Sequence, residues 1–184
     1  MGIMKHASVA LCALLAALLL AAGPAAAQGQ RDRPATKEGF LVGFSVGFGS
    51  TFPCDECPSL SGDIHIGAMA TSNVAIVADF GAVGGDDESF DEPGSLAVGA
   101  LAVKFWPHQR FWLKAGVGVG TTFSTDFDER WDSDHRRGKR QWAGIAAAGF
   151  EVAQIGVFVV DVQVRGAFVK DHQSVAVGIG FNWY

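Results

Sequence analysis

The sequence alternates between bulky apolar residues and small or polar residues over much of its length. In the segment 39–49, GFLVGFSVGFG, phenylalanine and valine occupy every second position, and mostly glycine, serine and leucine lie between them. A period of two residues places successive side chains on opposite faces of an extended strand. An amphipathic helix needs a period of about 3.6 residues, and the glycines would weaken it. The pattern therefore predicts a β-strand with one bulky apolar face.

Seven further segments show the same alternation, so eight strands are expected. The segment 141–152 is rich in alanine and glycine and has the weakest pattern. The predicted strands are 39–49, 60–70, 74–82, 95–105, 111–123, 141–152, 157–168 and 174–184.

The connections between these segments alternate in length. The short connections are 71–73, 106–110 and 153–156, whereas 50–59, 83–94 and 124–140 are longer and acidic or of mixed charge. Only the last connection on the second side, 169–173, is short. Short turns at one end and longer polar loops at the other are typical of an up-and-down barrel. The fold class predicted is all-β, an eight-stranded antiparallel up-and-down transmembrane β-barrel.

The composition of the second strand face favours a transmembrane barrel over a soluble lipocalin-like one. A soluble exterior carries about 25–35% charged residues, but here glycines, Ser45 and Trp112 occupy much of the second face. Such residues fit the narrow interior of an eight-stranded barrel, which leaves just enough room for side chains. The larger apolar residues are then expected to face lipid.

The second face also carries charges, which are expected to lie inside the barrel. Acids and bases nearly balance there, and buried charges need partners. This balance favours a salt-bridged plug over a path for protons or small ions. The predicted interior network consists of Asp63, His65, Asp79, Lys104, Lys114, Glu151, Asp161 and Arg165, together with Gln163.

Aromatic residues gather near the strand ends, as expected at the two interfaces of a bilayer. The girdle predicted at the end with the short turns consists of Phe40, Phe105, Trp106, Phe111, Phe150, Phe158, Phe181, Trp183 and Tyr184. The girdle predicted at the other end consists of Phe48, Phe80, Phe123, Trp142 and Phe168.

The N-terminal 27 residues have the features of a cleaved secretory signal peptide. Lys5 precedes the apolar run 8–23, and Ala25-Ala26-Ala27 forms a small-residue processing site. The expected organisation is a signal peptide at 1–27, a polar periplasmic lead-in at 28–38 and the barrel at 39–184. Without Lys5 the formal net charge changes from −5 to −6, which argues against nucleic acid as a partner.

Several short motifs, taken in order, resemble those of the outer membrane β-barrel domain family, the small eight-stranded OmpA/OmpX type. They are GFSVGFGS, a Cys-x-x-Cys loop, AVKFWP, FWLKAGVGVG, AGFEV and the terminal VGIGFNWY, and they span roughly residues 39–184. The resemblance implies a bacterial outer membrane location, contact with membrane lipid and lipopolysaccharide, and a monomer. It also implies that the barrel assembly machinery reads the C-terminal strand. Family members typically end in phenylalanine, and this chain has Tyr184 at that position.

Cys54 and Cys57 invite more than one interpretation. The oxidising environment that an exported protein enters favours a local disulfide within the first loop. A zinc site usually needs four ligands, and a redox motif is expected at a helix start in a βαβ unit. The disulfide is the preferred hypothesis, and metal or redox roles stay open. No cofactor and no resident metal are expected.

The charged connections and one polar triplet offer weaker hypotheses. The stretch 126–140 and the acidic stretch 86–92 suit binding of divalent cations or lipopolysaccharide head groups, or are simply solvated loops. Asp171, His172 and Ser174 are the residue types of a hydrolase triad, but a triad is defined by geometry and not by adjacency. The chain is therefore not expected to be an enzyme.

The sequence favours a small closed barrel with a structural or surface-interaction role, displaying acidic and mixed-charge loops outside the cell. Two alternatives remain: a soluble periplasmic barrel that binds a hydrophobic ligand, and a narrow pore for small solutes.

Overall fold

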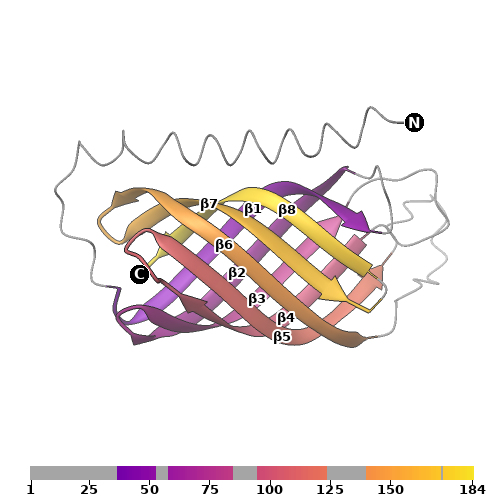
Figure 1. Ribbon diagram of the computed structural model, residues 1–184, viewed down its shortest axis with the longest axis horizontal. Helices are drawn as coiled ribbons and strands as arrows, with labels where there is room; N and C mark the ends of the chain where they lie inside the picture. Colours follow the sequence, from indigo (N-terminus) through magenta and orange to yellow (C-terminus); the bar gives the residue numbers. More distant parts are fainter. Residues whose placement is uncertain (1–36, 53–57, 85–94, 124–139, 171) are drawn as a thin grey trace, which may run out of the picture. The chain divides into compact units, whose positions relative to one another are not determined.

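The computed structural model describes residues 37–52, 58–84, 95–123, 140–170 and 172–184. Eight antiparallel strands pair in chain order, and pairing of the last strand with the first closes the barrel (Figure 1). The predicted eight-stranded up-and-down architecture is thus confirmed. The strands are β1 (Phe40–Phe52), β2 (Pro58–Thr71), β3 (Val74–Gly84), β4 (Ser95–Phe105), β5 (Phe111–Phe123), β6 (Gln141–Ile155), β7 (Phe158–Val169) and β8 (His172–Trp183).

The strands begin and end within three residues of the predicted ranges, and most of the differences extend a strand into a predicted connection. The strand β6 runs on to Ile155, although residues 153–156 were predicted to be a connection. A register shift between Glu151 and Ala153 places an extra residue in β6, and Ile155 pairs directly with Phe158. Gly156 has a φ of 60°, which glycine adopts without steric cost, so the turn needs very few residues. Among the described residues, no helix is long and apolar enough to cross a membrane.

The two barrel ends differ, and we name them by their connections. The turn end carries the tight connections between β2 and β3, β4 and β5, and β6 and β7, together with the start of β1 and the end of β8. The loop end carries the other four connections. This division follows the alternating connection lengths in the sequence.

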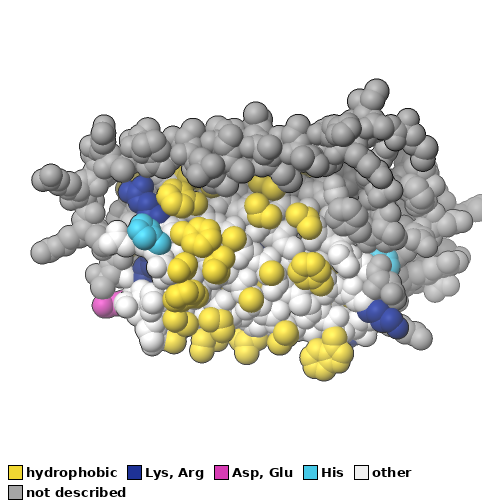
Figure 2. All heavy atoms as spheres, in the orientation of Figure 1, with side chains coloured by type: hydrophobic (Ala, Val, Ile, Leu, Met, Phe, Trp, Pro, Cys, Tyr) yellow, Lys and Arg dark blue, Asp and Glu magenta, His cyan; other side chains and the backbone are white. Residues whose placement is uncertain are grey.

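Bulky apolar side chains point outward along the strands. The exposed fraction is 77% for Phe48, 70% for Val117 and 62% for Ile64. On the face that Figure 2 shows, apolar side chains lie over the barrel wall and charged side chains lie toward its two ends. Phe44 and Val162, which the alternation placed outward, are exposed and half-buried respectively.

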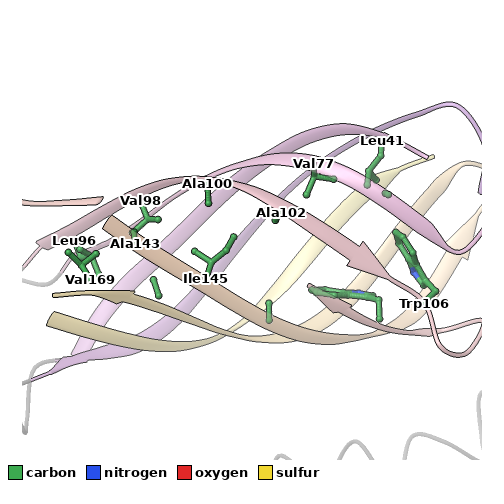
Figure 3. Close-up of a cluster of buried hydrophobic side chains, with 14 residues drawn as sticks. Leu41, Val77, Leu96, Val98, Ala100, Ala102, Trp106, Ala143, Ile145 and Val169 are labelled. Atoms are coloured by element: carbon green, nitrogen blue, oxygen red, sulfur yellow. The ribbon is translucent and has the colours of Figure 1, made fainter. Parts of the chain in front are cut away.

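The opposite faces of the strands enclose an interior that is apolar over part of its length. Figure 3 shows this cluster, with Leu96 and Val169 near one end and Trp106 near the other. Many of its members are alanines and valines, because a barrel of eight strands leaves little interior width. The alternation predicts mainly glycines and charges on this face, so the apolar part is larger than expected. The cluster comprises Leu41, Ala75, Val77, Leu96, Val98, Ala100, Ala102, Trp106, Trp112, Ala143, Ile145, Ala147, Ala167 and Val169.

Two residues predicted for the outward girdle lie inside the barrel instead. Trp106 is only 4% exposed, and Tyr184 packs against the interior cluster. The reason is the two-residue period itself. Trp106 has the same parity as the buried Lys104, and Tyr184 has the same parity as the buried Asn182. Their places in the girdle were assigned from nearness to a strand end, without regard to this parity.

The other aromatic residues at the turn end lie on the outer surface. Phe44 stacks on Phe181 with ring centroids 4.9 Å apart, and Phe158 packs against Trp183 at 5.1 Å. Offset aromatic contacts of this kind add to the gain from burial alone. The outward aromatic residues at this end are Phe40, Phe105, Phe111, Phe150, Phe158, Phe181 and Trp183. At the loop end, Phe48, Phe80, Trp142 and Phe168 point outward, and the side chain of Phe123 lies outside the described part.

Inward glycines make room for the largest interior side chains. A Cβ atom added at Gly149 would overlap the ring of Trp112, its partner on β5, and one added at Gly81 would overlap the guanidinium of Arg165. Each glycine therefore fixes where a large neighbour can lie.

We expect Gly149→Ala to destabilise the barrel by about 1–3 kcal/mol, because the rigid indole of Trp112 must shift in a packed interior. The measurement is urea unfolding of the folded protein in detergent micelles. Gly144→Ala is the matched control on the same strand, because its nearest neighbour would be a carbonyl oxygen at 3.9 Å. Equal stability of the two variants would contradict the proposed packing.

Candidate functional site in the barrel interior

The charged residues of β2, β3, β5 and β7 meet in a central ion-pair cluster made of Asp63, Asp79, Lys114 and Arg165. The Lys114 ammonium donates to Asp79 at 2.5 Å, and the Arg165 guanidinium donates to the other oxygen of Asp79 at 2.6 Å. Arg165 also reaches Asp63 at 2.9 Å. Lys114 lies 3.8 Å from Asp63. These four side chains are at most 8% exposed, so each charge has left water and depends on its partners.

Neighbouring polar groups complete the cluster. The hydroxyl of Ser45 on β1 donates to Asp63, and the ring of His65 lies 3.5 Å from the same carboxylate. Because residues 63 and 65 share the inward face of β2, the two-residue period brings them together. The cluster thus links four acidic and basic side chains with groups from the adjoining wall.

A second set of contacts runs from His65 toward the turn end through Asn182. The Asn182 side-chain oxygen lies 2.9 Å from His65 Nε2 and accepts a hydrogen bond from Lys104 at 3.1 Å. The Asn182 amide donates to Asp161 at 2.7 Å. The Trp112 indole donates to the same carboxylate oxygen at 3.2 Å. Lys104 also lies 4.2 Å from the centroid of Trp112, within the range of a cation–π interaction.

At the turn end, one oxygen of Glu151 accepts three hydrogen bonds. The donors are the Lys37 ammonium at 2.6 Å, the Trp106 indole at 2.7 Å and the Tyr184 hydroxyl at 3.2 Å. Burial raises the pKa of Tyr184, which keeps its hydroxyl protonated and able to donate. We call Trp106, Glu151 and Tyr184, with the Gln109 carbonyl, the turn-end cage.

Lys37 was not predicted as an interior residue. It belongs to the segment expected to be a polar lead-in, yet its side chain is 10% exposed, and its ammonium lies within cation–π range of the rings of Trp106 and Tyr184. Burial lowers the pKa of Lys37, and the Glu151 carboxylate opposes this change. Together with Lys104, Lys114 and Arg165 it gives four interior cations in the described part of the chain, matching the four acids.

The structure places every predicted charged residue of the network inside the barrel, since all eight are at most 8% exposed. It also adds residues to the network beyond those predicted. Asn182 and Tyr184 could have been found from their parity on the last strand, and Ser45 and Trp112 were placed inward without assigned partners. Lys37 carried no periodic signal at all. The additional residues are Lys37, Ser45, Trp106, Trp112, Asn182 and Tyr184.

Asp63, His65 and Asp79 would offer three metal-ligand atoms within 4.8 Å of one another. Both carboxylates are already paired with Lys114 or Arg165, so two cations occupy the electrostatic role that a metal ion would have. The group is therefore best described as part of the ion-pair cluster.

Several sequence hypotheses lie outside the described residues. These are the Cys54–Cys57 pair, the acidic stretch 86–92, most of the charged stretch 126–140 and Asp171 of the considered triad. The disulfide and the binding roles of the loops stay predictions.

Comparison with known proteins finds similarity in structure alone. No protein-family model matches the sequence, and no curated protein matches it. Among solved structures, neisserial surface protein A is similar with a TM-score of 0.62 at 11% identity, covering 78% of this chain and 96% of that one. The protein Ail of Yersinia pestis has a TM-score of 0.49 at 11% identity, covering 79% and 99%. The N-terminal barrel of Pseudomonas aeruginosa OprF has a TM-score of 0.48 at 15% identity, covering 78% and 97%.

Proposed function

We propose that this chain is a small outer membrane barrel with a closed interior and a structural or surface-interaction role. The observation that carries the proposal is the sorting of side chains between the two faces of the wall. Most phenylalanine, valine and isoleucine side chains point outward, and the ion pairs and their hydrogen-bonding partners point inward. A bilayer stabilises this arrangement, because its acyl chains cover the apolar exterior. The closed sheet pairs the backbone N–H and C=O groups of its strands with one another, so they are not left without hydrogen bonds in the lipid.

The fold shared with neisserial surface protein A supports the same location, since that protein is described as a surface protein of Neisseria. A cleaved signal peptide at 1–27 would supply the export route. The partners proposed are membrane lipid and lipopolysaccharide around the wall, and the barrel assembly machinery through the last strand during biogenesis. The charged connections at the loop end would then face outside the cell, where they contact lipid head groups or other molecules.

The arrangement is the reverse of what a soluble carrier of hydrophobic ligands needs. Such a barrel has apolar residues inside and a charged exterior, whereas here Phe48 is 77% exposed and Asp79 is fully buried. Cell fractionation tests the location. The protein should stay with the outer membrane after a salt wash and show heat-modifiable mobility on gels. Release by osmotic shock would contradict the proposal.

The interior ion pairs support a closed barrel over a pore. Asp79, Lys114 and Arg165 reach across the interior from three strands, and the contacts continue through Asn182 to the turn end. We expect planar-bilayer recordings of the purified protein to show no stable large conductance. A reproducible large open channel would contradict a closed barrel and favour the small-solute pore.

A further inference from the structure

We propose that the turn-end cage is a binding site for a primary ammonium group, and that the chain's own Lys37 fills it. The site takes unbranched alkylammonium ions when Lys37 is removed. This inference goes beyond the proposed function and concerns only the turn end of the barrel.

The surroundings of the Lys37 ammonium are those of a cation site. Its nitrogen lies 2.6 Å from a Glu151 oxygen and 3.1 Å from the Gln109 carbonyl oxygen. It also lies 4.4 Å from the centroid of Trp106 and 5.2 Å from that of Tyr184. A carboxylate, a carbonyl and two aromatic faces together offer charge, hydrogen-bond acceptance and cation–π attraction.

The cage is held together by contacts that do not involve Lys37. The Trp106 indole and the Tyr184 hydroxyl both donate to Glu151, and the two rings meet edge to face with centroids 5.6 Å apart. The backbone amide of Trp106 donates to Asn73, and that of Tyr184 donates to Val157. Glu151 and Trp106 are each only 4% exposed. The site should therefore keep its shape when the lysine side chain is absent.

Lys37 enters the cage from outside the strand framework. It precedes β1, and Gly39, which separates them, has a φ of 82°. This left-handed conformation favours glycine and lets the chain turn from the start of β1 toward the turn-end cage. Lys37 thus behaves as a tethered ligand on a short leader, with an effective concentration of about millimolar or higher.

The geometry also indicates which cations the site should prefer. A primary ammonium has three N–H donors, and the cage offers two oxygen acceptors beside the rings. A quaternary ammonium keeps the cation–π attraction but has no donor for Glu151 or Gln109. We therefore expect n-butylammonium to bind more tightly than butyltrimethylammonium, and neutral n-butanol not to bind.

The test is a titration of Lys37→Ala protein folded in a maltoside detergent, which carries no ammonium group of its own. The probe is n-butylammonium chloride, with potassium chloride at the same ionic strength as the control. The readout is the indole N–H resonance of Trp106 in nitrogen-15 spectra. We expect a saturable shift in the Lys37→Ala protein and at least about tenfold weaker binding in the wild type, where the tethered lysine competes.

Three results would overturn the proposal. They are no saturable shift in the Lys37→Ala protein, equal affinity in the wild type, and the same shift with potassium chloride or n-butanol. Adding Glu151→Gln should weaken binding by at least about tenfold, since it removes the charge that faces the ammonium. The solute comparison within Lys37→Ala keeps the test decisive if that double variant does not fold. The titration is done in micelles, so its outcome does not depend on the role of the barrel in the cell.

Discussion

Replacing Val117 with arginine is expected to lower the free energy of unfolding by about 2–4 kcal/mol when the protein is folded in lipid vesicles. Val117 lies in the middle of β5 and is 70% exposed on the outer wall. An arginine at that position would place a charge near the bilayer midplane, where water is absent. The measurement is urea unfolding followed by tryptophan fluorescence.

The matched control is Val157→Arg in the turn after β6. Val157 is 59% exposed but lies at the turn end, where an added charge near the interface costs about 0–1 kcal/mol. On a soluble barrel both substitutions would be nearly neutral, because exposed surface changes usually stay within about 0.5 kcal/mol. Equal small effects at both positions would therefore contradict a membrane-spanning wall.

Replacing Asp79 with alanine is expected to destabilise the barrel by about 3–5 kcal/mol. Asp79 is fully buried, and its two oxygens accept from Lys114 and Arg165. Without this carboxylate, two buried cations would share Asp63 alone. The same urea titration measures the loss.

Glu38→Ala is the control for removal of one acid, because Glu38 is exposed on the leader. It should change the unfolding free energy by no more than about 0.5 kcal/mol. Adding Lys114→Met to Asp79→Ala should recover part of the loss, because one of the two buried cations that would share Asp63 is then removed. If Asp79→Ala matches Glu38→Ala, the central cluster does not stabilise the fold.

The two-residue period determined which side chains share a face, and through that most of the fold. It placed Asp79, Lys114 and Arg165 on one face and Val117 on the other before any strand pairing was known. The girdle prediction for Trp106 and Tyr184 is wrong, because the period and not nearness to a strand end decides which face a side chain occupies. Their parity was already visible in the sequence.

The sequence pattern does not indicate which interior side chains contact one another. Alternation indicates that a residue faces inward, but it does not specify the strand register, which decides what lies opposite. That Arg165 reaches Asp79 and Asp63, or that Asn182 joins His65 to Asp161, depends on how eight strands are staggered around a closed wall.

The sequence by itself thus determined the strands, their connections and the division of side chains between an apolar and a polar face, because each of these is local and periodic. Only the tertiary structure decided that Lys37 enters the barrel and that Glu151 joins it to Trp106 and Tyr184. Closure of the barrel brings the segment before β1, the ends of two other strands and a turn together at the turn end. Contacts between residues so far apart in the chain leave no periodic trace in the sequence.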